Sequence, residues 1–250
     1  MSLSPAPGAA PAWRMVLAQA SLETRMLLRN GEQLLLTVII PTLLLVLFST
    51  VHVVDTGPGE RIDFLAPGIL ALAVMSTAFT GQAIATGFER RYGVLKRLAV
   101  SPMPRWALLA GKTLSVLLVE AMQIGLLTGV AIALGWSPRG GAATALLLLV
   151  AGTAAFSGLG LLMAGTLRAE ATLAAANLIY LLLLVCGGVI FPLSRFGGAA
   201  HVLHGTPTAA LSGGLRAALS GGHTPWRDLL ALAVWAVLSI AAAARCFRWE

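Results

Sequence analysis

Hydrophobic residues in this chain gather into six long runs that polar stretches separate. The runs cover residues 34–54, 66–88, 106–134, 142–167, 171–191 and 226–246. A helix needs about 20 apolar residues to cross the hydrocarbon core of a bilayer, and each run reaches that length. The run at 106–134 is longer than necessary, so we expect it to tilt or to project into water. The pattern predicts an all-α integral membrane protein with six transmembrane helices.

A different pattern precedes the first run. Between residues 13 and 31, apolar side chains such as Trp13, Leu17 and Leu28 recur at helical spacing, and polar side chains such as Arg25 take the other side. This pattern predicts an amphipathic interfacial helix, although an ordinary surface helix has the same period. Residues 1–12 are rich in Pro, Ala, Gly and Ser, which predicts a disordered tail. The expected organisation is a tail at 1–12, an interfacial helix at 13–31 and a six-span domain at 32–250.

The composition agrees with a membrane protein. Hydrophobic residues make up 58% of the chain and charged residues only 11%, whereas an average soluble domain has about 25% charged residues. The runs leave no room for a soluble catalytic domain. The net charge is +7 and the isoelectric point is near 10.7. Because the basic residues follow the ends of the apolar runs, we do not expect nucleic acid as a partner.

The distribution of Lys and Arg predicts the orientation in the membrane. With the N-terminus inside, five of the 17 Lys and Arg residues fall in outer loops, namely Arg61, Arg139, Arg195, Arg216 and Arg227. The others flank the inner ends of the spans. Positive residues favour the cytoplasmic side, so both termini are expected in the cytoplasm. A composition rich in Ala, Gly and Arg suggests a bacterium, and hence a multi-pass protein of the bacterial cytoplasmic membrane.

The densest basic cluster lies between the second and third runs, in FERRYGVLKRLAVSPMPRWALLAGK (residues 88–112). Tyr92, Leu95 and Leu98 recur every three residues and give a short helix an apolar side, and Pro102 and Pro104 end it. A basic inner loop can serve only as a topology anchor. The order in this segment favours a cytoplasmic helix held between two membrane helices, which suits it to receive force from a soluble partner.

The last outer stretch, residues 192–225, is long but carries little charge. Within it, Thr206 and Pro207 are typical of a helix start, with Thr as the cap and Pro in the first turn. Leu211 and Leu215 give that helix an apolar side, and the glycines at 221–222 end it. We expect short outer-face re-entrant helices before the sixth span.

Two of these segments resemble the permease subunits of type 2 ATP-binding cassette (ABC) exporters, which include bacterial drug-resistance, lipid and polysaccharide export permeases. In that family the inner segment often has the form Glu-Arg-x-x-Gly-x-Leu-x-x-Leu, followed by a Pro-containing turn and Gly-Lys. The matching residues here are Glu89, Arg90, Gly93, Leu95, Leu98, Pro102, Gly111 and Lys112. The second match is GGVIFPLSRF followed by HGTPTAALSGGLRAAL, which contains the outer-face motif residues Phe191, Pro192, Pro207 and Arg216. Gly205 and Thr206 replace the Leu-Asn of many members, so the outer helix differs there.

The resemblance implies a transmembrane permease subunit that forms the pathway for ATP-driven export of a small hydrophobic, amphiphilic or lipid-like substrate. It implies a second permease copy, identical or related, and two copies of a separate ABC ATPase that carries the ATP and Mg. The chain itself is then neither an enzyme nor the holder of a cofactor. The segment between spans two and three would be the coupling helix. Its expected ATPase-coupling residues are Glu89, Arg90, Arg91, Gly93, Leu95, Lys96, Arg97, Leu98, Pro102 and Pro104.

Polar residues within the runs are candidates for the translocation pathway. Glu120 and Gln123 share one side of the third run, and Asn177 lies in the fifth. They either line the pathway or make packing contacts between helices, and the sequence leaves both open.

Other chemistry has weaker support. Lys112 is the middle residue of a Gly-Lys-Thr sequence, but Trp106 stands where a phosphate loop requires Gly, so we interpret Lys112 as an anchor that snorkels to the interface. His201 and His204 are more typical of polar surface residues than of a metal site. The alternative function is a membrane-embedded enzyme or assembly factor with a six-helix bundle and no ATPase partner, but no convergent catalytic set is present in the sequence.

Overall fold

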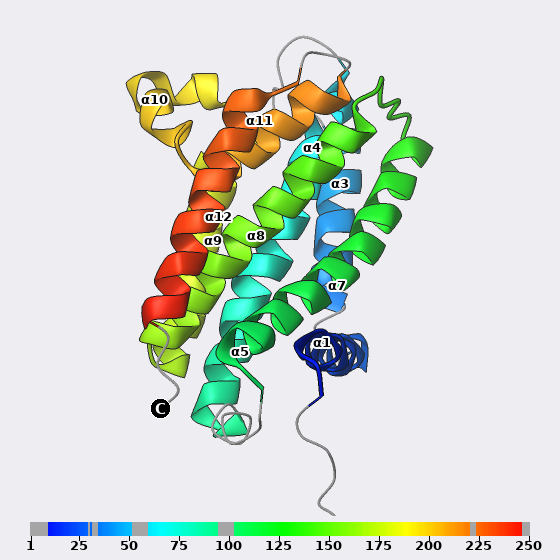
Figure 1. The fold of residues 1–250 in the computed structure, drawn as a ribbon. Helices are drawn as coiled ribbons and strands as arrows, with labels where there is room; N and C mark the ends of the chain where they lie inside the picture. The colour runs from blue at the N-terminus through cyan, green and yellow to red at the C-terminus, as the bar shows by residue number, and fades with distance from the viewer. Residues whose placement is uncertain are drawn as a thin grey trace, which may run out of the picture.

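The protein is described by a computed structural model that covers residues 10–29, 31, 35–51, 60–94, 103–220 and 224–246. These residues form a bundle of tilted helices (Figure 1), and no strand occurs among them. The predicted all-α class is confirmed for this part of the chain.

Five helices within the described ranges are long and apolar enough to cross a membrane. The first is continuous from Arg61 to Arg91 and consists of α4 (Arg61–Val74), the π-helical segment η2 (Met75–Gly81) and α5 (Gln82–Arg91). The others are α7 (Arg105–Ala133), α8 (Ala142–Thr166), α9 (Ala169–Cys186) and α12 (Trp226–Cys246). They correspond to the second to sixth predicted runs, so the chain is a multi-pass membrane protein.

The first predicted run forms a shorter apolar helix. It contains η1 (Leu35–Ile39) and α3 (Ile40–Thr50), and its apolar part from Thr37 to Thr50 is shorter than the other five. Pro41 lies in the first turn of α3, directly after the π-helical segment η1, and has no N–H to donate to the preceding turn. The count of six spans therefore stays a prediction.

The helix from Arg61 to Arg91 is the most buried of the five and lies at the centre of the bundle. It packs against α3, α7, α8, α9 and α11. The fifth helix, α9, is shorter than the predicted run 171–191, because it ends at Cys186 and the chain bends away at Gly187. Val189 and Ile190 then fold into the core instead of extending the helix.

Further helices lie at the two ends of the bundle. At the lower end in Figure 1, α1 (Ala12–Arg29) is seen nearly end-on and packs against α7. At the upper end lie η3 (Leu193–Ala199), α10 (Ala200–Leu203) and α11 (Pro207–Leu219). The predicted start of α11 is confirmed, because the Thr206 hydroxyl accepts a hydrogen bond from the Ala209 amide at 3.3 Å. Most of α11 is buried against α4, α8 and α12.

Candidate functional site

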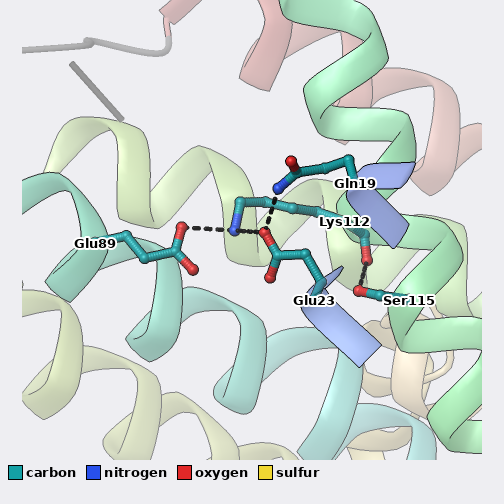
Figure 2. Close-up of polar contacts among 5 residues, drawn as sticks. All are labelled: Gln19, Glu23, Glu89, Lys112 and Ser115. Atoms are coloured by element: carbon teal, nitrogen blue, oxygen red, sulfur yellow. Dashed lines mark hydrogen bonds and ion pairs between the residues drawn. The ribbon is translucent and has the colours of Figure 1, made fainter. Parts of the chain in front are cut away.

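A cluster of charged side chains around a buried lysine joins three helices at the α1 end of the bundle, which we call the inner end after the predicted orientation. The Lys112 ammonium on α7 lies 2.6 Å from Glu89 Oε2 on α5 and 2.8 Å from Glu23 Oε1 on α1. Figure 2 shows Lys112 Nζ between the two carboxylates. Lys112 is only 3% exposed, so the interpretation of Lys112 as a snorkelling anchor is wrong. The ammonium pairs with two acids inside the protein instead of reaching water.

The local sequence explains how α1 comes close enough to form this cluster. Glu23 lies one turn after Gln19, whose side-chain amide donates to Glu23 Oε1 at 2.8 Å. Gly111 precedes Lys112, and a Cβ at that position would lie 2.8 Å from Gln19 Cβ. Glycine has no Cβ, and this lets α1 and α7 pack closely at Gly111. The Gly111-Lys112 pair therefore combines close packing with the ion pair.

A small cavity with several polar side chains in its lining lies beside the cluster. It is about 30 Å³ in size and is lined by Glu23 and Lys112 together with Gln82 and Thr86 of α5. Both polar atoms of the Gln82 amide and the Thr86 hydroxyl are buried without a hydrogen-bond partner among the described residues. Because a water molecule needs about 10–15 Å³ and several polar partners, the cavity has the size and lining for about two water molecules.

Two arginines fix the inner end of α5 to the turn between α8 and α9. Arg90 donates to the backbone carbonyl of Leu167, and Arg91 pairs with Glu170 on α9. Both side chains of the Arg91–Glu170 pair are exposed. Both arginines therefore have partners within this chain.

The predicted coupling residues lie partly within the described chain. Glu89, Arg90, Arg91, Gly93 and Pro104 are described, and Leu95, Lys96, Arg97, Leu98 and Pro102 lie outside the described residues. Gly93 follows α5 in a turn with φ of +70°. Tyr92 stacks on Phe88 and is 69% exposed. The described base of this segment thus presents an aromatic ring to the surface.

The three pathway candidates have different surroundings. Glu120 is buried and accepts a hydrogen bond from the Thr153 hydroxyl of α8. Gln123 is also buried, accepts from Thr77 at 3.0 Å and donates to the backbone carbonyl of Thr37. Asn177 is exposed on α9, and its amide donates to the Leu173 carbonyl at 2.9 Å. The structure brings Glu120 and Gln123 into the bundle and leaves Asn177 on its surface.

At the outer end, Arg216 of α11 connects three segments. Its guanidinium donates to the backbone carbonyl of Phe64 at 3.0 Å and to that of Val189 at 2.9 Å. Its central carbon lies 3.7 Å from the centre of the Phe64 ring. Burial lowers the pKa of Arg216 to about 9. Gly68 makes the arrangement possible, because a Cβ there would overlap the Val189 carbonyl oxygen.

The remaining outer-face motif residues frame this contact. Phe191 and Pro192 are half-buried where the chain leaves Val189, and Pro207 is buried at the start of α11. His201 and His204 are both exposed. The described residues contain no group of three or more His, Cys, Asp or Glu side chains that would hold a metal ion.

The sequence reasoning missed Glu23 as a site residue. The sequence did mark this residue, because Glu23 is the single acid between residues 12 and 29, a stretch that also contains three arginines. Nothing in the sequence indicated which cation it meets, since Lys112 is 89 positions further along the chain.

Comparison with models of protein families gives a match. The family model described as ABC-2 type transporter matches residues 16–219. Comparison with curated proteins gives no match. The matched region begins within α1 and ends at the last residue of α11, so it includes the Lys112 cluster and the Arg216 contact.

Proposed function

The chain belongs to the ABC-2 type transporter family, the permease family of type 2 ABC transporters, and on that premise we propose that it forms the translocation pathway of an ATP-driven exporter. The family makes it a transmembrane transport subunit that is not itself catalytic, which sets aside the membrane-embedded enzyme. The family also implies association with an ABC ATPase. We propose two ATPase copies and two permease copies, with six spans and both termini of this chain in the cytoplasm.

In this proposal the segment from Glu89 to Pro104 is the coupling helix that contacts the ATPase. The observation that supports it is the ion cluster at Glu89, where the segment begins. Lys112 links Glu89 to Glu23, so α5, α7 and α1 are connected at one point. Breaking a buried ion pair by removing one partner costs about 3–5 kcal/mol. A force applied to the segment would therefore move the three helices together instead of bending one of them.

The arginines after Glu89 support the same role. Arg90 and Arg91 connect the base of the segment to Leu167 and Glu170, at the turn between α8 and α9. Movement of this base would thus reach a fourth and a fifth helix. Exposed Tyr92 adds an apolar surface for a protein partner, since aromatic residues are enriched in protein interfaces.

The proposed cargo is a small hydrophobic, amphiphilic or lipid-like molecule. Support comes from the low charge of the outer stretches, which suit such a cargo better than a large charged one. Buried Glu120 and Gln123 are proposed pathway residues. Asn177 would join them only if a second permease copy covered the exposed face of α9.

The test is reconstitution with the ABC ATPase encoded beside the gene, followed by measurement of complex formation and ATP hydrolysis in lipid. Wild type is compared with Glu89→Gln and Leu95→Asp, and Glu60→Gln serves as the control because Glu60 is exposed at the start of α4. We expect a stable complex with wild type and the control, and ATPase binding at least about tenfold weaker, or hydrolysis uncoupled from the permease, in the two variants. If no ATPase binds and both variants behave as wild type, the segment is only a topology anchor and the proposal is wrong.

A further inference from the structure

A large apolar cleft lies between α7, α8 and α12, on the inner half of the bundle. Its volume is about 620 Å³, within the range of about 300–1,000 Å³ that is usual for small-molecule sites. The lining includes Leu109, Thr113 and Leu117 of α7, Gly158 and Leu161 of α8, and Ile240 of α12. The inner-half cleft thus has the size of a ligand site and an apolar wall on three sides.

A buried carboxyl group lies one helical turn further along α7 than the last of its residues that line the cleft. Thr113 and Leu117 line it, and Glu120 follows seven and three residues later on the same side of α7. The bond from the Thr153 hydroxyl shows that the Glu120 carboxyl turns toward α8, which forms the opposite wall. On α8, Ser157 is adjacent to Gly158 and one turn before Leu161, both of which line the cleft. Glu120 therefore turns toward α8 next to the cleft, and Ser157 lies on α8 one turn after Thr153 and one turn before Leu161.

Both polar groups have unused bonding capacity. Glu120 is 2% exposed and Ser157 is 1% exposed. Glu120 Oε1 and the Ser157 hydroxyl have no hydrogen-bond partner among the described residues. Burying a carboxylate without a cation is costly, and burying a polar atom without a partner adds to that cost. A positively charged group placed here would stabilise the carboxylate and supply the missing donor.

We propose that the inner-half cleft binds an amphiphilic cation, with its apolar body between α7, α8 and α12 and its amine paired with Glu120. The apolar lining selects the body of the ligand, and the unpaired carboxyl oxygen selects its charge. Ser157 accepts a further hydrogen bond from the amine. This inference rests on the proposed function, because it narrows the amphiphilic cargo to one that carries a positive charge.

The test measures direct binding to the purified full chain in lipid nanodiscs, without an ATPase. The probe is a fluorescent dansyl-alkylamine, and its N-acetylated form serves as the neutral counterpart with nearly the same apolar body. We expect the amine to bind at least about tenfold more tightly than the acetylated probe, as for a hydrogen bond to a charged group. Glu120→Gln, which keeps the side-chain size and the Thr153 contact, should remove this preference and leave binding of the acetylated probe unchanged.

Two further variants separate the site from general effects. Glu60→Gln removes an exposed outer carboxylate and should bind both probes as wild type does. Ala110→Leu adds bulk to the cleft wall and should weaken both probes without changing their ratio. Equal binding of the two probes to wild type, or an unchanged preference in Glu120→Gln, would overturn the proposal. If Glu120→Gln fails to fold, two results decide the question: the preference of wild type for the amine over the acetylated probe, and the effect of Ala110→Leu on both probes.

Failure of this inference is distinguishable from failure of the proposed function. The probes report on the permease alone, whereas the proposed function is tested by ATPase binding and hydrolysis. A chain that couples to its ATPase but shows no amine preference would still be an exporter, with its cargo recognised elsewhere.

Discussion

Lys112 Nζ lies 2.6 Å from Glu89 Oε2, and this contact joins the first turns of α7 to the last turn of α5. The two residues lie 23 positions apart, at the two ends of the basic segment 90–111. Glu23 binds the same ammonium from α1. The inner end of the bundle therefore has a charged centre within an otherwise apolar protein.

Replacing Lys112 with Met should lower the free energy of unfolding by about 3–5 kcal/mol, because two half-buried carboxylates lose their only described cation. Thermal or denaturant unfolding in detergent measures this. The double variant Lys112→Met with Glu89→Gln should lose less than the two single changes combined, since it leaves one carboxylate unpaired instead of two. Strict additivity of the single effects would contradict a direct interaction between Lys112 and Glu89.

Replacing Gly111 with Ala should loosen α1 from α7, because the new Cβ would lie 2.8 Å from Gln19 Cβ. The expected cost is about 1–3 kcal/mol, as for other overpacked contacts. Limited proteolysis of α1 gives a direct measurement, with faster cleavage expected in the variant.

The matched control for this change is Gly125→Ala. Gly125 is also on α7, but a Cβ added there would have no neighbouring atom within 4 Å among the described residues. Alanine should stabilise the helix there by up to about 1 kcal/mol, because glycine is a poor helix former. Equal proteolysis of the two variants would show that the close approach at Gly111 is unimportant.

Replacing Arg216 with Lys should destabilise the outer end by about 1–3 kcal/mol, although the charge is kept. Lysine cannot donate in the same plane to the Phe64 and Val189 carbonyls and stack on the Phe64 ring. Thermal unfolding measures the loss. Arg227→Lys is the control, since Arg227 is exposed at the start of α12, and a similar loss in both variants would point to a general effect of lysine.

The two cysteines test the orientation. Cys246 is exposed at the end of α12, and the predicted topology puts it on the cytoplasmic side. In a Cys186→Ser background, a membrane-impermeant maleimide should label Cys246 in inverted membrane vesicles and not in intact cells. Labelling of intact cells would reverse the predicted orientation of the last span.

Much of the helical plan followed from the sequence. The run at 226–246 became α12 (Trp226–Cys246), and the cap signal at Thr206 and Pro207 became the start of α11. These features are local, because apolar length sets a span and neighbouring residues set a cap. The first run was less clear, since its described apolar helix is shorter than the others.

The sequence by itself determined the class of protein, because a chain with so few charges and such long apolar runs can bury its backbone polar groups in lipid only as helices. Through its resemblance to a known family, it also suggested a coupling role for the segment from Glu89 to Pro104 and pointed to the outer-face motif. Only the tertiary structure decided which polar groups meet. Glu23 with Lys112, Glu120 with Thr153, and Arg216 with Phe64 are pairs that lie 33 to 152 positions apart. Helix periodicity fixes the side on which each residue lies, but the packing of one helix against another selects its partner.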